Sequence, residues 1–120
     1  MMNNQYNQRE LREIITLTKI SITLHNQYKE YNERMQNFTI SEKEYKRVRK
    51  IAMYKLERHN KVREKIKSLQ EKMNMSARDA MAIRTYGMTF DEVEKVKGKD
   101  KREWGRNLEI MYQIFRESCY

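Results

Sequence analysis

Apolar side chains recur every three or four residues along most of this chain, which is the spacing of amphipathic helices. In the first third of the chain they predict a helix over about 8–38, with Ile15 and Ile22 widening its apolar face. A wide apolar face has to be covered on two sides, so we expect more than one partner helix. The positions on this face are Leu11, Ile14, Leu17, Ile20, Leu24, Tyr28, Tyr31, Met35 and Phe38.

A second helix, predicted over 41–73, has an apolar face and a basic face about opposite to it. The apolar positions are Tyr45, Val48, Ala52, Leu56, His59, Val62, Ile66, Leu69 and Met73. The basic positions are Lys43, Arg47, Lys50, Lys61, Lys65 and Lys72, with Tyr54 among them. This segment holds 12 of the 26 lysines and arginines and 5 of the 17 acids, so it supplies +7 of the net charge of +9.

The break between these helices carries a strong start signal, because Ser41 and Glu44 form a capping box. A short connection between two long amphipathic helices predicts an antiparallel hairpin. With the turn near residue 39 or 40, the numbers of paired residues sum to about 79. His25 is then expected opposite Tyr54, and His59 opposite Ile20, so the two histidines should lie far apart.

The last third of the chain predicts three shorter helices. Ser76 is a good N-cap for a helix over 77–86, and Gly87 follows where a C-terminal glycine belongs. Thr89 and Glu92 form a second capping box before a helix over 90–97, which ends at Gly98. A last helix is expected from residue 100 to about 118, with its apolar line at Trp104, Leu108, Met111 and Phe115. The fold class is therefore all-α, a long antiparallel helical hairpin (1–75) followed by a compact C-terminal bundle of three shorter helices (76–120).

Composition supports this fold class and argues against several kinds of protein, such as membrane-spanning and disulfide-bonded ones. The chain has no proline and three glycines in 120 residues, which favours an almost wholly helical protein. It has no apolar run long enough to span a membrane and no apolar signal region at its start. The lone Cys119 excludes an intramolecular disulfide and a cysteine-based zinc site. These features indicate a cytoplasmic protein, and the strongly basic balance suggests an anionic partner or a solvated basic surface.

The most specific feature of the sequence is the stretch 89–108, in which a two-turn helix, a glycine and a longer helix follow one another. Gly98 tolerates the left-handed backbone that such a turn needs. The last helix then directs Lys101, Arg102 and Arg106 away from its apolar line, toward phosphates or base edges in the major groove. This stretch resembles the helix-turn-helix of small phage and plasmid regulators, although Glu94, Lys97 and Asn107 depart from the usual pattern. A plain helical hairpin that caps the long one is an equal alternative.

The basic face of the second helix is the other candidate site, because cations along one face can follow a phosphate backbone. The predicted nucleic-acid-binding residues are Arg47, Lys50, Lys61, Lys65, Lys99, Lys101, Arg102 and Arg106. Surface lysines are also found on helices simply as a solvated face.

No pattern of an enzyme is present. The sequence has no serine, histidine and aspartate arrangement, no glycine-rich phosphate loop and no acidic metal cluster. His59 lies on the apolar stripe and is expected to be a core histidine. We therefore expect no catalytic residue, no cofactor and no metal.

Methionines 73, 75, 81 and 88 gather where the hairpin meets the C-terminal helices, where they suit core packing or an adaptable docking surface. Self-association would cover the wide apolar face of the first helix, so a homodimer is predicted. The first functional hypothesis is a non-enzymatic protein that binds double-stranded DNA, as a transcriptional regulator or a DNA-packaging accessory of the phage or plasmid kind. The second is a small helical adaptor or inhibitor that binds an acidic surface of a larger protein or of a nucleic-acid enzyme.

Overall fold

The computed structural model describes residues 6–97, 104–117 and 119, without the side chains of residues 97, 104, 105 and 107. These residues form five helices and no strand, which confirms an all-α fold with a long hairpin. In the part of the chain so described, none of the helices combines the length and the apolar character that a membrane span requires. The helices are α1 (Gln8–Met35), α2 (Glu42–Lys72), α3 (Ala77–Tyr86), α4 (Phe90–Lys97) and α5 (Trp104–Glu117).

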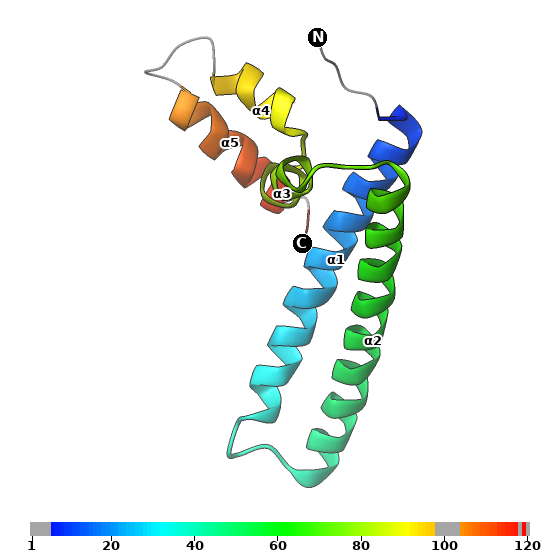
Figure 1. Ribbon diagram of the computed structural model, residues 1–120. Helices are drawn as coiled ribbons and strands as arrows, with labels where there is room; N and C mark the ends of the chain where they lie inside the picture. The colour runs from blue at the N-terminus through cyan, green and yellow to red at the C-terminus, as the bar shows by residue number, and fades with distance from the viewer. Residues whose placement is uncertain (1–5, 98–103, 118, 120) are drawn as a thin grey trace.

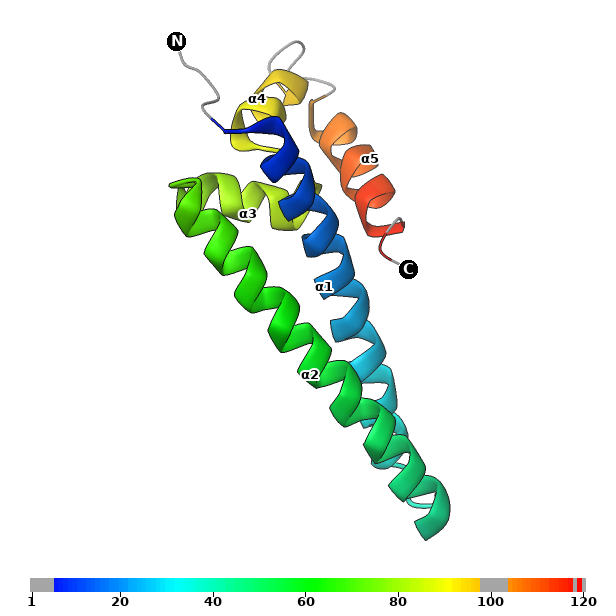
Figure 2. The ribbon, with the colours of Figure 1, turned by 90° about the vertical axis from the view of Figure 1, so that its right-hand side faces the viewer.

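The two long helices lie antiparallel and side by side, and the three short helices gather at one end of them (Figures 1 and 2). That end carries the start of α1 and the end of α2, whereas the connection 36–41 lies at the other end of the hairpin. The Cα radius of gyration is 17.9 Å, against about 14 Å for a compact domain of this length. The molecule is therefore an elongated hairpin with a cluster of helices at one end.

The predicted helix caps are present. The side chains of Ser41 and Ser76 accept hydrogen bonds from the backbone N–H groups of Glu44 and Asp79, each at 3.1 Å. Gly87 ends α3 with φ +75°, in the left-handed region where a glycine is favoured. Local hydrogen bonding thus fixes the starts of α2 and α3 and the end of α3.

The first helix ends three residues earlier than predicted, because α1 stops at Met35 and Phe38 is fully exposed. Asn37 explains this difference: its side-chain Oδ1 accepts hydrogen bonds from the backbone N–H of Thr39 at 3.0 Å and from the Thr39 hydroxyl at 2.8 Å. An asparagine that bonds to the backbone two residues on favours a turn over a helix. The assignment of Phe38 to the apolar face was therefore wrong.

The faces of the hairpin also differ from the predicted stripes at Ile20 and Tyr45, which are both exposed. On α1 the buried residues between Ile14 and Leu24 are instead two polar ones, Thr18 and Ser21. Ile20 lies about 100° around the helix from Ser21, so it lies at the edge of the buried face and is 39% exposed. The hydroxyl of Thr18 donates to the Ile14 carbonyl at 2.7 Å, which satisfies its polar group inside the helix. Val48, Ala52 and Ile66 are buried on the facing side of α2.

Within the same chain, α3 packs on the first half of α1, and the end of α5 reaches the middle of α1. Ile83 of α3 packs with Leu11 and Ile14 of α1, and Leu69, Met73 and Met75 border this cluster. At the end of α5, the hydroxyl of Thr23 donates to the backbone carbonyl of Cys119, and the Lys19 ammonium lies 6.0 Å from the centre of the Phe115 ring. Ile15 of the wide face therefore packs within the chain, whereas Ile22 lines a cavity between α1, α2, α3 and α5, and the homodimer stays a prediction.

A second apolar cluster joins the three short helices, with Ala82, Met88, Val93 and Leu108 buried in it. Three of the four clustered methionines pack against apolar neighbours, but Met81 is 65% exposed. The first cluster, by contrast, contains residues of both parts of the molecule, because Ile83 of α3 packs on α1 of the hairpin.

Candidate functional site

Three of the four predicted basic residues on α2 make ion pairs with exposed carboxylates. An Arg47 Nη lies 2.6 Å from Glu44, the Lys61 ammonium 3.3 Å from Glu57, and the Lys65 ammonium 3.4 Å from Glu13. Lys50 is exposed and lines a groove along α2 with Tyr45 and Met53. Exposed pairs of this kind contribute about 0–1 kcal/mol each. Because these ion pairs are weak, a phosphate group can replace the carboxylates and bind the same cations.

The basic charge of α2 lies on the surface of the molecule. Eleven of its twelve lysines and arginines are exposed, and they outnumber its five acids along a helix of 31 residues. At 1.5 Å per residue such a helix is about 46 Å long. The arrangement is a straight rod with excess positive charge along most of its length.

Of the predicted residues in the C-terminal third, Gly98, Lys99, Lys101 and Arg102 lie outside the described residues. Arg106 is exposed on α5, and Leu108 is buried two residues further on. Phe90, Val93 and Val96 of α4 belong to the apolar cluster that contains Leu108. The contacts that lock α4 to α5 are thus present, and the side chain of Trp104 lies outside the described residues.

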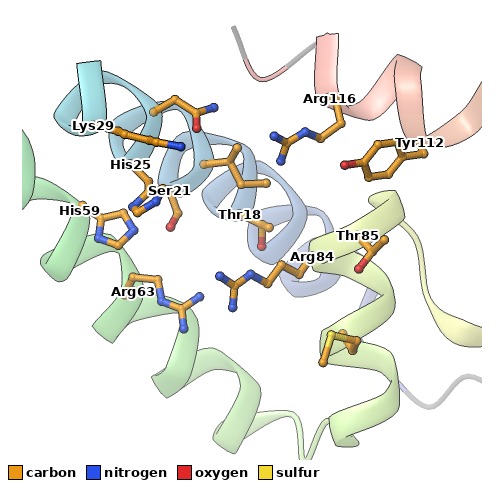
Figure 3. A pocket seen from close by; sticks show the side chains of 13 residues that line it. Thr18, Ser21, His25, Lys29, His59, Arg63, Arg84, Thr85, Tyr112 and Arg116 are labelled. Atoms are coloured by element: carbon orange, nitrogen blue, oxygen red, sulfur yellow. The ribbon is translucent and has the colours of Figure 1, made fainter. Parts of the chain in front are cut away.

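A cavity of about 680 Å³ opens between α1, α2, α3 and α5, and lysine and arginine side chains line it from all four helices (Figure 3). Each of the four helices contributes one cation: Lys29, Arg63, Arg84 and Arg116. In Figure 3 the three guanidinium groups and the Lys29 ammonium point into the same space from different sides. Both histidines of the chain, His25 and His59, also line it.

None of the described residues that line the cavity carries a carboxylate, and none of its four cations makes an ion pair with a described acid. Hydroxyl groups of Ser21 and Tyr112 project toward the cavity (Figure 3). The Nδ2 of Asn26 is buried and donates to no acceptor among the described residues. A cavity rich in donors and cations is suited to an anion with several acceptor oxygens.

The two histidines lie together rather than far apart, with ring centroids 5.6 Å from each other. The prediction considered only the positions of the backbones along the hairpin. His25 pairs with Tyr54 in that register, and His59 lies five residues further along α2, or about 7.5 Å along the axis. Side chains lean toward the N-terminus of their own helix, however, and in an antiparallel pair that brings these two rings toward each other. The ion pair between Lys72 and Glu10, at 2.8 Å, is offset in the same direction, by three residues.

His59 reports the electrostatics of the cavity. Burial lowers the pKa of this ring from its ordinary 6.5, and the charges of His25, Arg63 and Arg84 lower it further, while a hydrogen bond with Asn60 opposes them. His59 is only half-buried, so it does not belong to a closed core as the sequence suggested. The cavity therefore disfavours an added positive charge.

Sequence patterns did not reveal this cavity, because its four cations are far apart in the chain. Arg63 lies about 200° around α2 from both Lys61 and Lys65, so it lies apart from the basic face of the predicted pattern. Lys29, Arg84 and Arg116 are single cations on three other helices. The one available signal was the position of Arg63 on the apolar side of a long basic helix.

Across the ranges that the structure describes, no group of three or more histidine, cysteine, aspartate or glutamate side chains is arranged to hold a metal ion. Comparison with family models, with curated proteins and with solved structures finds no match to this chain.

Proposed function

We propose that this protein is a non-enzymatic, double-stranded-DNA-binding protein, a transcriptional regulator or a DNA-packaging accessory of the phage or plasmid kind. The observation that carries the proposal is the exposed excess of positive charge along α2, eleven exposed cations on a helix of 31 residues. DNA presents one negative charge per about 1.7 Å of its axis, so a basic rod about 46 Å long can meet many phosphates.

The two predicted surfaces have different roles in this proposal. Arg47, Lys50, Lys61 and Lys65 contribute affinity, because phosphate contacts are independent of base sequence. Arg106 and the basic residues 99, 101 and 102 contribute position and sequence preference from the start of the last helix. The packing of α4 on α5 supports this second role, because a recognition helix needs a rigid support.

The salt dependence of DNA binding tests this assignment. Fluorescence anisotropy with a labelled duplex gives the slope of log K against log salt, which changes by about 0.9 for each lost phosphate contact. We expect Lys50→Gln with Lys61→Gln to reduce the slope by roughly 2 and to weaken binding at low salt. The matched control is Arg9→Gln with Arg34→Gln, which removes the same charge from exposed positions of α1.

Equal slopes for the two double variants would mean that net charge alone attracts the DNA. Arg106→Gln should weaken binding to a preferred duplex more than to a scrambled one. A protein that binds no duplex at low salt contradicts the whole proposal.

An adaptor or inhibitor that binds an acidic protein surface is the second candidate. The observation that favours it is the groove on α2, in which exposed Tyr45 and Met53 lie among three cations, Lys46, Arg49 and Lys50, and one acid, Glu42. Apolar contacts with a basic rim suit an acidic protein surface. Recovery of one partner protein that survives nuclease treatment, and is lost on Tyr45→Ser with Met53→Ser, favours this candidate over DNA binding.

A further inference from the structure

The cavity between α1, α2, α3 and α5 differs from the rest of the surface in how its charges are balanced. Elsewhere in the described chain, six lysines and arginines lie within 4 Å of a carboxylate, five of them on or beside α2. In the cavity, four cations and two histidines face one another without a described acid. Like charges held together repel, and an anion between them removes that repulsion.

We propose that this cavity is a binding site for a compact ligand that carries a di- or triphosphate group, as a free nucleotide does. Three of the four cations are arginines, whose planar groups bind phosphate oxygens in pairs. They approach from α2, α3 and α5, with Lys29 on the α1 side (Figure 3). A single phosphate carries too little charge to balance four cations, whereas a chain of two or three phosphates matches them.

The size and the polar lining of the cavity agree with this ligand class. Its volume of about 680 Å³ lies within the range of pockets that hold small molecules, about 300–1,000 Å³. The Nδ2 of Asn26, which has no acceptor among the described residues, and the hydroxyls of Ser21 and Tyr112 are further donors for phosphate oxygens. A DNA duplex, whose major groove alone is about 12 Å wide, is too broad to enter a space between packed helices.

The two histidine rings allow a direct test, because they are the only histidines in the chain and both line the cavity. Their ring resonances are followed by NMR during titration with tripolyphosphate, ATP, inorganic phosphate and adenosine. We expect both rings to shift with tripolyphosphate and with ATP, at least tenfold more weakly with inorganic phosphate, and not with adenosine. Equal affinity for tripolyphosphate and ATP would show that the cavity contacts only the phosphates. Tighter binding of ATP would show that it contacts the nucleoside as well.

Variants on opposite sides of the cavity make the test specific. Each of Arg84→Gln and Arg116→Gln should weaken tripolyphosphate binding about tenfold, measured by calorimetry, because each removes a charge-assisted contact. The matched control is Arg47→Gln with Lys61→Gln, which removes two charges from the opposite side of α2 and should change the affinity less than threefold. Circular dichroism of every variant establishes that it is folded.

Three outcomes overturn the proposal. The first is no shift of either histidine with millimolar tripolyphosphate, and the second is an equal loss of affinity in the control variant. The third is displacement of tripolyphosphate by a duplex that shifts the same two rings, which would make the cavity part of a DNA interface. Because the DNA-binding test uses charges on the other side of α2, either proposal can fail while the other holds.

Discussion

Gly87 is the residue at which backbone conformation and packing both demand the absence of a side chain. Its φ of +75° is costly for other residues, and a Cβ placed there would lie 2.4 Å from Cδ1 of the buried Phe115. A left-handed residue costs about 1–2 kcal/mol and overpacking about 1–3 kcal/mol. We therefore expect Gly87→Ala to lower the free energy of unfolding by about 2–5 kcal/mol in urea denaturation.

Asn74 supplies the control for this prediction, because it also has a positive φ, of 52°. Asn74→Ala introduces the backbone cost without the collision with Phe115, so its loss should be about 1 kcal/mol. Combining Gly87→Ala with Phe115→Leu should cost less than the sum of the two changes, since the smaller side chain relieves the contact. Equal losses at positions 74 and 87 would show that the contact with Phe115 has no effect.

His59 makes the stability of the fold depend on pH. Its pKa is lowered in the folded protein by burial first, then by the charges of His25, Arg63 and Arg84, against the hydrogen bond with Asn60. Lys29 and Arg116 face the same cavity from α1 and α5. The unfolded chain therefore binds a proton at a higher pH than the folded one, so stability is full above about pH 6.5 and falls as the pH drops toward the lowered pKa.

Thermal unfolding of wild type and His59→Gln between pH 8 and pH 5 measures this effect. The wild type should lose more stability than the variant over that range, and tripolyphosphate should reduce the difference, because an anion in the cavity favours the charged ring. Identical pH profiles for the two proteins would contradict the prediction. Tripolyphosphate itself titrates near pH 6. This effect is the same for wild type and His59→Gln, so it cancels when the two proteins are compared at the same pH.

At the scale of the elements, Asp79 of α3 holds three segments together. Its carboxylate accepts hydrogen bonds from the Tyr6 hydroxyl at 2.5 Å and from the backbone N–H of Phe90, at the start of α4, at 2.9 Å. Burial, and then the bond to Asp79, raise the pKa of Tyr6 above its ordinary 10.0. The segment before α1 and the start of α4 are thus both hydrogen-bonded to the side chain of Asp79.

We expect Asp79→Ala to cost about 2–4 kcal/mol of stability, because it leaves two donors without their acceptor. Asp79→Asn keeps one acceptor oxygen and should cost about half as much. Asp91→Asn is the control, an acid in the first turn of α4 that is exposed, and should change stability by less than about 0.5 kcal/mol. Urea denaturation gives these values, and a loss in Asp79→Asn no larger than in Asp91→Asn would refute the role of the carboxylate.

The elements were predictable where a local signal fixes them. Ser41, Ser76 and Gly87 determine helix ends through hydrogen bonds or backbone conformation within a few residues, and these ends agree with the sequence. The first helix was extended to Phe38 because the apolar spacing continues to that residue, whereas the side chain of Asn37 favours a turn and α1 ends at Met35. The cavity depends on the relative placement of four helices, and one cation on each carries no periodic signal. The meeting of His25 and His59 depends on the lean of side chains in an antiparallel pair, which counting residues from the turn ignores.

At the scale of the whole molecule, net charge sets how two copies can meet. Each chain carries +9, so a homodimer must form between two strongly basic molecules. Added salt screens this repulsion, since the Debye length falls from about 30 Å at 0.01 M to about 10 Å at 0.1 M. The same salt weakens DNA binding, because phosphate contacts release counterions.

We therefore expect the predicted homodimer to strengthen with salt, in the opposite direction to DNA binding. Sedimentation velocity at micromolar protein should show the dimer fraction rising between 0.05 and 0.5 M NaCl, while anisotropy with a duplex shows affinity falling over the same range. Small-angle scattering adds a check on shape, since a lone chain has a Cα radius of gyration of 17.9 Å and a dimer exceeds it. A dimer that weakens as salt rises would mean that ion pairs hold the two copies together, which would place acids of one copy against the basic face of α2 in the other. A monomer at every salt concentration would show that the prediction of a homodimer is wrong, and DNA binding would then belong to the single chain.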